Sequence, residues 1–130
     1  MTNDELKTFA SINADDLEGE CLTLSDRLVY LYDLYSTADK DYNVCNEAVA
    51  TATSLKYIEY RDSMISNNIK PTENLITNYV QADESLVPLV EQKYTLKRQK
   101  EFLYGLIQSM NAKRDSIKSL TFLRRNDERF

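Results

Sequence analysis

The sequence predicts an all-α protein, and two observations lead to this fold class. Gly and Pro together number only four in 130 residues, whereas β-sandwiches and barrels need turn residues about every 8–12 positions. A seven-residue apolar repeat runs through the second half of the chain. With 42% hydrophobic and 28% charged residues, the composition is typical of a folded protein. The length allows one domain, so we expect a single helical domain over residues 1–130.

The repeat predicts a long helix over residues 85–123. Its members are Leu89, Leu96, Leu103, Met110 and Ile117. Five consecutive matches at one spacing indicate a single continuous helix. Asp83 or Ser85 is expected to cap its start, and Pro88 then lies in the first turn, where the missing N–H costs little.

The first half predicts another long helix, over residues 23–66, after an acidic lead-in at 1–22. Apolar residues recur four and three apart from Leu24 onward, and the stripe drifts to Leu55, Ile58 and Ile65. An interruption near residues 38–41 is left open. Thr23 or Ser25 is the expected cap. Between the two long helices, Thr72 is expected to cap a short helix over residues 72–81.

Two long helices joined by a short connection are expected to pack antiparallel as a hairpin. A turn centred near residue 75 would place Cys45 opposite Leu106 and Leu31 opposite Leu120. The segments 28–35 and 102–107 are apolar or aromatic nearly all round, which exceeds what a lone hairpin can cover. The sequence therefore predicts a homo-oligomer; a compact three- or four-helix monomer is the alternative. The predicted subunit interface comprises Leu28, Leu31, Tyr32, Tyr35, Phe102, Leu103, Leu106 and Ile107.

The residue types present argue against catalysis. The chain has no His, no Gly-rich loop and two cysteines, Cys21 and Cys45, without a zinc-ligand spacing. We therefore expect no enzyme activity, no cofactor and no metal site, and interpret the acidic run at 15–20 as solvated. The acidic N-terminus lacks signal-peptide features, and no apolar stretch approaches the ~20 residues that span a bilayer. We expect a cytoplasmic protein that makes no membrane contact.

The distribution of charge is more informative than the total of −5. Residues 1–70 hold 6 basic and 13 acidic residues, whereas residues 93–125 hold nine basic residues against Glu101 and Asp115. Aromatic residues, Tyr94 among them, lie between these cations. Cations beside aromatic rings suit single-stranded nucleic acid, because the cations meet phosphates and the rings stack on unpaired bases. The basic residues of this segment are Lys93, Lys97, Arg98, Lys100, Lys113, Arg114, Lys118, Arg124 and Arg125.

Over roughly residues 24–123 the chain resembles the phage recombination mediators of the UvsY type. The resemblance rests on the order of short motifs: Leu55-Lys56-Tyr-Ile-Glu-Tyr-Arg61, Lys70-Pro-Thr-Glu73, Gln81-Ala82-Asp83, Phe102-Leu-Tyr-Gly105 and Arg114-Asp-Ser-Ile-Lys118-Ser-Leu. It implies a ring-like homo-oligomer that binds single-stranded DNA. Such a protein helps to load a RecA-like recombinase onto DNA covered by single-strand-binding protein, and a phage protein would act in the infected host cell.

In this family, basic residues near the end of the first long helix contribute to DNA binding, which maps onto Lys56 and Arg61. Two alternatives stay open: a structural or adaptor protein whose basic helix pairs with the acidic helix, and an acidic inhibitor that mimics DNA. The residues predicted to bind DNA are Lys56, Tyr57, Tyr60, Arg61, Lys93, Lys97, Arg98 and Lys100.

Overall fold

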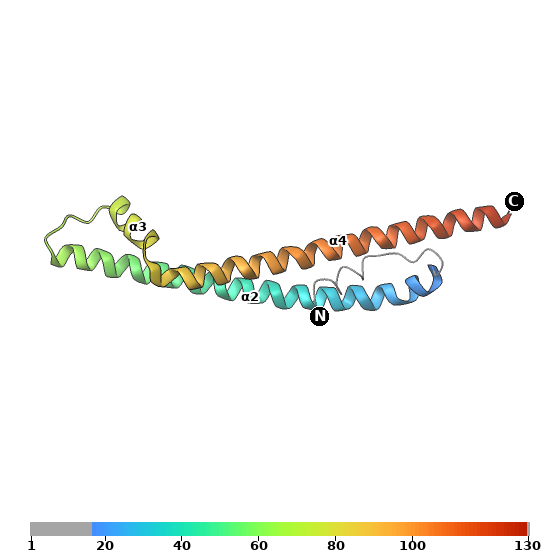
Figure 1. Cartoon of the computed structure of the whole chain (residues 1–130), viewed down its shortest axis with the longest axis horizontal. Coiled ribbons are helices and arrows are strands. Elements are labelled where there is room, and N and C mark those ends of the chain that lie inside the picture. The colour runs from blue at the N-terminus through green and yellow to red at the C-terminus, as the bar shows by residue number, and fades with distance from the viewer. Residues whose placement is uncertain (1–16, 130) are drawn as a thin grey trace. The chain divides into compact units, whose positions relative to one another are not determined.

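The computed structural model describes residues 17–129, and this part of the chain is helical with no strand. In chain order it contains α2 (Leu17–Ser66), α3 (Glu73–Gln81), the 3₁₀ helix η2 (Glu84–Leu86) and α4 (Val87–Arg129), as Figure 1 shows. The predicted all-α class is confirmed. α2 is unbroken across residues 38–41. Residues 1–16 of the expected lead-in lie outside the described residues.

The start of α2 differs from the expectation. Thr23 is not a cap, because the helix already begins at Leu17. The Thr23 hydroxyl donates to the backbone carbonyl of Gly19, 3.1 Å away, which is a bond made inside helices. Glu20 therefore belongs to α2 and not to a lead-in before it.

The end of α2 is set by Asn68, whose φ of 57° is left-handed. The Ile69 N–H donates to the Met64 carbonyl over 2.9 Å, and the Asn68 N–H donates to the Ile65 carbonyl over 3.2 Å. These two bonds form a Schellman motif, in which Asn serves as the usual substitute for Gly. The helix therefore ends without a Gly or Pro at its terminus.

The caps predicted for the later helices are present. The Thr72 hydroxyl accepts from the Leu75 N–H and caps α3. The Asp83 carboxylate accepts from the Ser85 N–H, at 2.8 Å, and so caps η2, which leads directly into α4. α4 then runs as one helix through the whole seven-residue repeat.

The described residues divide into two compact units. Unit 1 contains residues 17–38 and 99–129, and unit 2 contains residues 39–98. In unit 1, α2 and α4 share one apolar core. Its buried members are Leu24, Leu31, Ala38, Leu103, Leu106, Ile107, Met110 and Ile117, with Leu28, Leu34, Tyr35 and Phe102 packed against them.

This core corrects the predicted subunit interface. Leu31 has no exposed surface, and Leu103, Leu106 and Ile107 are also buried within the chain. Leu28, Tyr35 and Phe102 are half-buried against the same core. Seven of the eight predicted residues are therefore covered at least in part within the chain, whereas Val29, Tyr30 and Tyr104 of the same two segments stay exposed. Of the eight predicted interface residues, Tyr32 alone keeps an exposed side chain, at 49%.

In unit 2, α3 packs on the last turns of α2. Met64 of α2, Ile76 and Val80 of α3, and Leu86 of η2 form its buried core. The predicted register, with Cys45 opposite Leu106, is wrong. The Cys45 thiol lies 3.8 Å from the Leu89 carbonyl, and Leu106 belongs to the core of unit 1. The reason is that α3 occupies the final turns of α2, so α4 begins further back along α2 than a simple turn would allow.

Within residues 17–129, no helix combines the length and the apolar character that crossing a lipid bilayer requires.

Candidate nucleic-acid interface

The residues predicted to bind DNA fall into two groups, one on each long helix. Lys56, Tyr57, Tyr60 and Arg61 lie on α2, and the remaining four lie on α4. All of them belong to unit 2 except Lys100, which belongs to unit 1 and is half-buried with interactions of its own.

On α2, Lys56 and Tyr60 meet the carboxylate of Asp83. The Tyr60 hydroxyl donates to Asp83 Oδ2 over 2.8 Å, and Lys56 Nζ lies 3.7 Å from the same oxygen. Lys56 Nζ also lies 3.4 Å from Glu59 Oε2. The other Asp83 oxygen accepts from the backbone N–H and hydroxyl of Ser85. We call these residues the Asp83 cluster; it fastens the start of η2 to α2.

The electrostatics of the Asp83 cluster follow from these contacts. The pKa of Asp83 is lowered from 3.8 to about 2, chiefly because the Ser85 hydroxyl and then the Tyr60 hydroxyl donate to the ionised carboxylate. The pKa of Tyr60 is raised because its hydroxyl donates to Asp83. The pKa of Lys56 is raised by its hydrogen bond to Glu59 and then by the charge of Asp83. Lys56 is therefore charged but already has two carboxylate neighbours.

Tyr60→Phe is expected to raise the pKa of Asp83 toward its usual range, because one of the donors to the carboxylate is lost. A lowered carboxyl pKa stabilises the fold above about pH 4, and this contribution is lost as the pH falls through about 2. Carboxyl carbon NMR titration between pH 6 and 1.5 measures the shift. Tyr57→Phe, a change one turn away, is the control and is expected to leave Asp83 titrating at about 2. Equal Asp83 pKa values in both variants would contradict the assignment.

The other aromatic and basic residues of this group have separate surroundings. The rings of Tyr60 and Tyr79 stack with centroids 5.7 Å apart, and Tyr79 keeps 48% of its surface exposed. Tyr57 is half-buried against the core of unit 2. Arg61 is exposed and lies 3.4 Å from the Asp62 carboxylate. Tyr79 is not among the residues predicted from the sequence to bind DNA.

On α4, Lys93, Lys97 and Arg98 surround Tyr94. Lys97 and Arg98 follow Tyr94 by three and four residues, which places all three side chains on one face of the helix. Lys97 and Arg98 are exposed, Lys93 is half-buried, and Tyr94 is 53% exposed. Within residues 17–129, none of the three cations forms an ion pair. We call these four residues the α4 patch.

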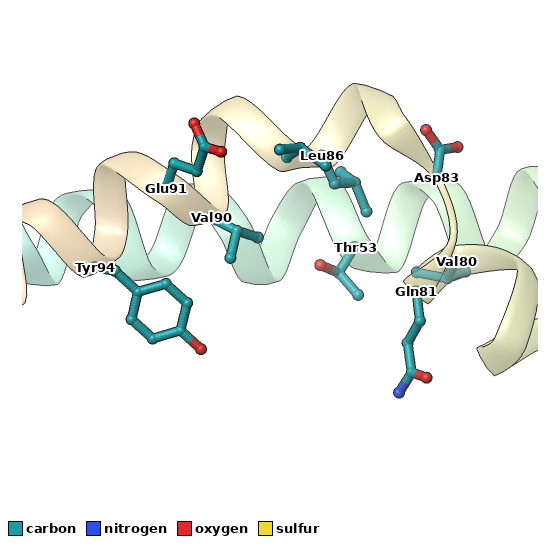
Figure 2. A pocket seen from close by; sticks show the side chains of 9 residues that line it. Thr53, Val80, Gln81, Asp83, Leu86, Val90, Glu91 and Tyr94 are labelled. Atoms are coloured by element: carbon teal, nitrogen blue, oxygen red, sulfur yellow. The ribbon is translucent and has the colours of Figure 1, made fainter.

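An apolar groove adjoins the α4 patch. It has a volume of about 430 Å³ and lies within unit 2, between Thr53 of α2, the end of α3 and the first turns of α4. Figure 2 shows the ring of Tyr94 at one end of the groove and Asp83 at the other. Tyr94 therefore has cations on one side and an open apolar surface on the other. The sequence predictions left Tyr94 out of the site, although its spacing from Lys97 and Arg98 was a usable signal. The remaining lining residues are Val80, Gln81, Leu86, Val87, Val90 and Glu91.

The remaining cations of α4, all in unit 1, are not equivalent. Lys113 is buried and pairs with Glu20, and Arg114 lies 3.8 Å from Asp115. Lys118 and Arg125 are exposed. Lys113 and Arg114 therefore already have carboxylate partners within unit 1, whereas Lys118 and Arg125 lie at its surface.

The described residues contain no group of three or more His, Cys, Asp or Glu side chains able to hold a metal ion. No protein-family model, no curated protein and no solved structure matches this chain.

Proposed function

We propose that this chain binds single-stranded DNA through the α4 patch and acts as a recombination mediator of the kind that the motif resemblance implies. The observation that carries the proposal is Tyr94, an exposed ring flanked by Lys97 and Arg98, which form no ion pair in the described residues. A base stacked on the ring would place its phosphates within reach of the two cations. Stacking and phosphate contact together are how sequence-independent single-strand binders work.

The α4 patch is a better candidate than the residues to which the family resemblance points. A phosphate at Lys56 would have to displace Glu59 and Asp83 from the ammonium group. A phosphate at Arg61 would compete only with the exposed Asp62. Among the described residues, no ion pair has to be displaced at the cations of the α4 patch, so we assign them the larger share of binding.

The proposed mechanism is multivalent. One patch offers only a few phosphate contacts, so its affinity for a single strand is low. Linking several copies raises the overall affinity by roughly 10²–10⁴ where one strand can reach several patches. We therefore propose an antiparallel hairpin subunit that assembles into a homo-oligomer. The strand held along it would be presented to a RecA-like recombinase in place of single-strand-binding protein.

Lys97→Ala with Arg98→Ala is expected to weaken binding to labelled oligo-dT by on the order of tenfold at low salt. Each phosphate contact contributes ~0.7 to the slope of log affinity against log salt, so the slope falls by about 1.4. Fluorescence anisotropy at 50 and 200 mM salt measures both. Tyr94→Leu is expected to weaken binding by about fivefold or more while leaving the slope unchanged, because stacking involves no counterion release.

The matched control is Lys40→Ala with Lys70→Ala, which removes the same charge from exposed positions of unit 2 outside the α4 patch. It is expected to change the affinity by less than about threefold. Equal losses in the two double variants would refute a localised site. Absence of binding by the wild type at 50 mM salt would refute DNA binding altogether.

A structural or adaptor protein is the second candidate function, and one observation favours it. Lys113, within the basic segment, is buried against Glu20 of the acidic helix, as expected of a basic helix that pairs with an acidic one. This candidate predicts no salt-dependent binding to oligo-dT, so the experiment above separates the two functions.

A further inference from the structure

The side of α2 away from the core of unit 2 carries a largely exposed apolar stripe, and at its start Val44 and Ala48 line an open groove with Leu89 and Leu96 of α4. Its positions recur alternately four and three residues apart, and we call them the outer stripe. Exposed fractions are 59% for Val44, 62% for Leu55, 44% for Ile58 and 55% for Ile65. The members of the outer stripe are Val44, Ala48, Thr51, Leu55, Ile58, Asp62 and Ile65.

From Thr51 onward, the outer stripe is distinct from the face of α2 that packs against α3 and η2. The inward face presents Ala52, Tyr60 and Met64 to α3 and η2. At 3.6 residues per turn, Tyr60 and Met64 lie between about a third and half a turn away from Leu55 and Ile58, whereas Ala52, three residues before Leu55, lies at the border of the two faces. A four-three spacing maintained over three heptads is the pattern of a coiled-coil seam. An exposed apolar surface of this length is typical of a protein interface.

We propose that a second copy of this chain covers the outer stripe, with the two α2 helices antiparallel about a twofold axis at Ser54. We choose this register because it brings residues of opposite charge together. Glu47 lies seven residues before Ser54 and Arg61 lies seven residues after it, both on the same flank of the stripe. The antiparallel pair therefore brings Glu47 opposite the partner's Arg61, and the symmetry repeats the contact.

The same register places small residues opposite large ones in the seam. Ala48 faces the partner's Ile58, and Thr51 faces the partner's Leu55, which favours close packing. Asp62 lies at the end of the overlap, opposite the partner's Val44, where its carboxylate remains close to water. A polar residue in a seam lowers affinity but disfavours other registers.

Other arrangements lack this complementarity. Moving the axis back by half a heptad places Lys40 opposite the partner's Arg61, which is a repulsive pair. Moving it forward by half a heptad places Ser54 opposite the partner's Arg61, with no ion pair. A parallel pair places Arg61 beside the partner's Ser66, again without a carboxylate. Of these arrangements, the antiparallel register about Ser54 is the one that places a carboxylate of the partner opposite Arg61.

This contact would supply the linkage that multivalent DNA binding requires, and in that respect it deepens the proposed function. It is tested without DNA, so either proposal can fail while the other stands.

The first test is disulfide crosslinking in a Cys21→Ser, Cys45→Ala background. Ser54→Cys is expected to form a covalent dimer under mild oxidation, because the two copies of residue 54 meet at the axis. Ser63→Cys, an exposed serine elsewhere on the same helix, is the control and is expected to stay monomeric. Ile65→Cys crosslinks only if the helices are parallel. Crosslinking of Ser63→Cys or Ile65→Cys as fast as Ser54→Cys would overturn the proposal.

The second test is a charge exchange followed by sedimentation equilibrium at low salt. Glu47→Arg alone, or Arg61→Glu alone, is expected to weaken dimerisation roughly tenfold, because two attractive pairs become repulsive. Both changes together are expected to restore the wild-type constant to within about threefold. Glu101→Arg, an exposed change in unit 1, is expected to have no effect. A monomeric wild type at 100 µM, or a double variant as weak as the single ones, would refute the interface.

Discussion

Replacing Glu20 by Ala is expected to lower the free energy of unfolding of unit 1 by about 3 kcal/mol. Lys113 of α4 is only 3% exposed, and its ammonium group pairs with the Glu20 carboxylate of α2. The substitution would leave that ammonium group in its buried position without Glu20. Arg27, 3.9 Å from the same carboxylate, is more exposed and contributes less. Urea unfolding followed by far-UV circular dichroism measures the loss.

Two variants make this prediction specific. Glu101→Ala removes an exposed carboxylate from α4 in the same unit, and is expected to change the unfolding free energy by less than about 0.5 kcal/mol. Glu20→Leu with Lys113→Met replaces the ion pair by apolar side chains. It is expected to recover most of the lost stability, because neither charge then remains buried. An unfolding free energy for Glu20→Ala equal to that for Glu101→Ala would contradict the assigned role.

The Glu20–Lys113 pair also limits how many of the cations of α4 can contact DNA. Net charge counts every cation equally, but burial removes Lys113 from any surface that a phosphate can reach. The cations of the α4 patch differ because no carboxylate among the described residues lies close enough to pair with them. A count of basic residues therefore overestimates how many cations can meet a phosphate. Which cations can do so depends on which of them are already buried or paired with a carboxylate.

Local signals were sufficient to predict the helices. The seven-residue repeat and the scarcity of Gly and Pro predicted the all-α class. Thr72 was correctly predicted as a cap, and Asp83, one of the two residues expected to cap the last helix, caps η2 just before it. These features act over one or two turns, so they can be recognised without knowledge of the packing. The start of α2 was predicted too late because Thr23 has a cap-forming side chain but bonds inside the helix.

The register of the helices could not be predicted in the same way. It depends on α3 packing over Met64 and the turns before it, which no local pattern encodes. The first half of the sequence also carries two apolar stripes on α2, and periodicity does not say which of them faces the core. From periodicity alone, the drift toward Leu55 and Ile58 is indistinguishable from the continuation of a single stripe. Burial separates the two, because these side chains are exposed while Met64 is buried.

Leu31 provides the sharpest distinction between the predicted subunit interface and the observed core. Its side chain has no exposed surface and lies among the apolar residues of unit 1. Leu31→Ala is expected to lower the free energy of unfolding by about 3 kcal/mol, because it removes buried methyl groups and leaves a cavity. Urea unfolding at several protein concentrations measures both the loss and its concentration dependence.

The concentration dependence decides where Leu31 acts. If its side chain packs within one chain, the difference between variant and wild type is the same at 1 µM and at 100 µM. If it packs between subunits, the difference grows with concentration, because the wild type alone gains stability from association. Val29→Ala, on the same helix but 69% exposed, is expected to change the unfolding free energy by less than about 0.5 kcal/mol. A concentration-dependent loss for Leu31→Ala would move this residue from the core of unit 1 to a subunit interface.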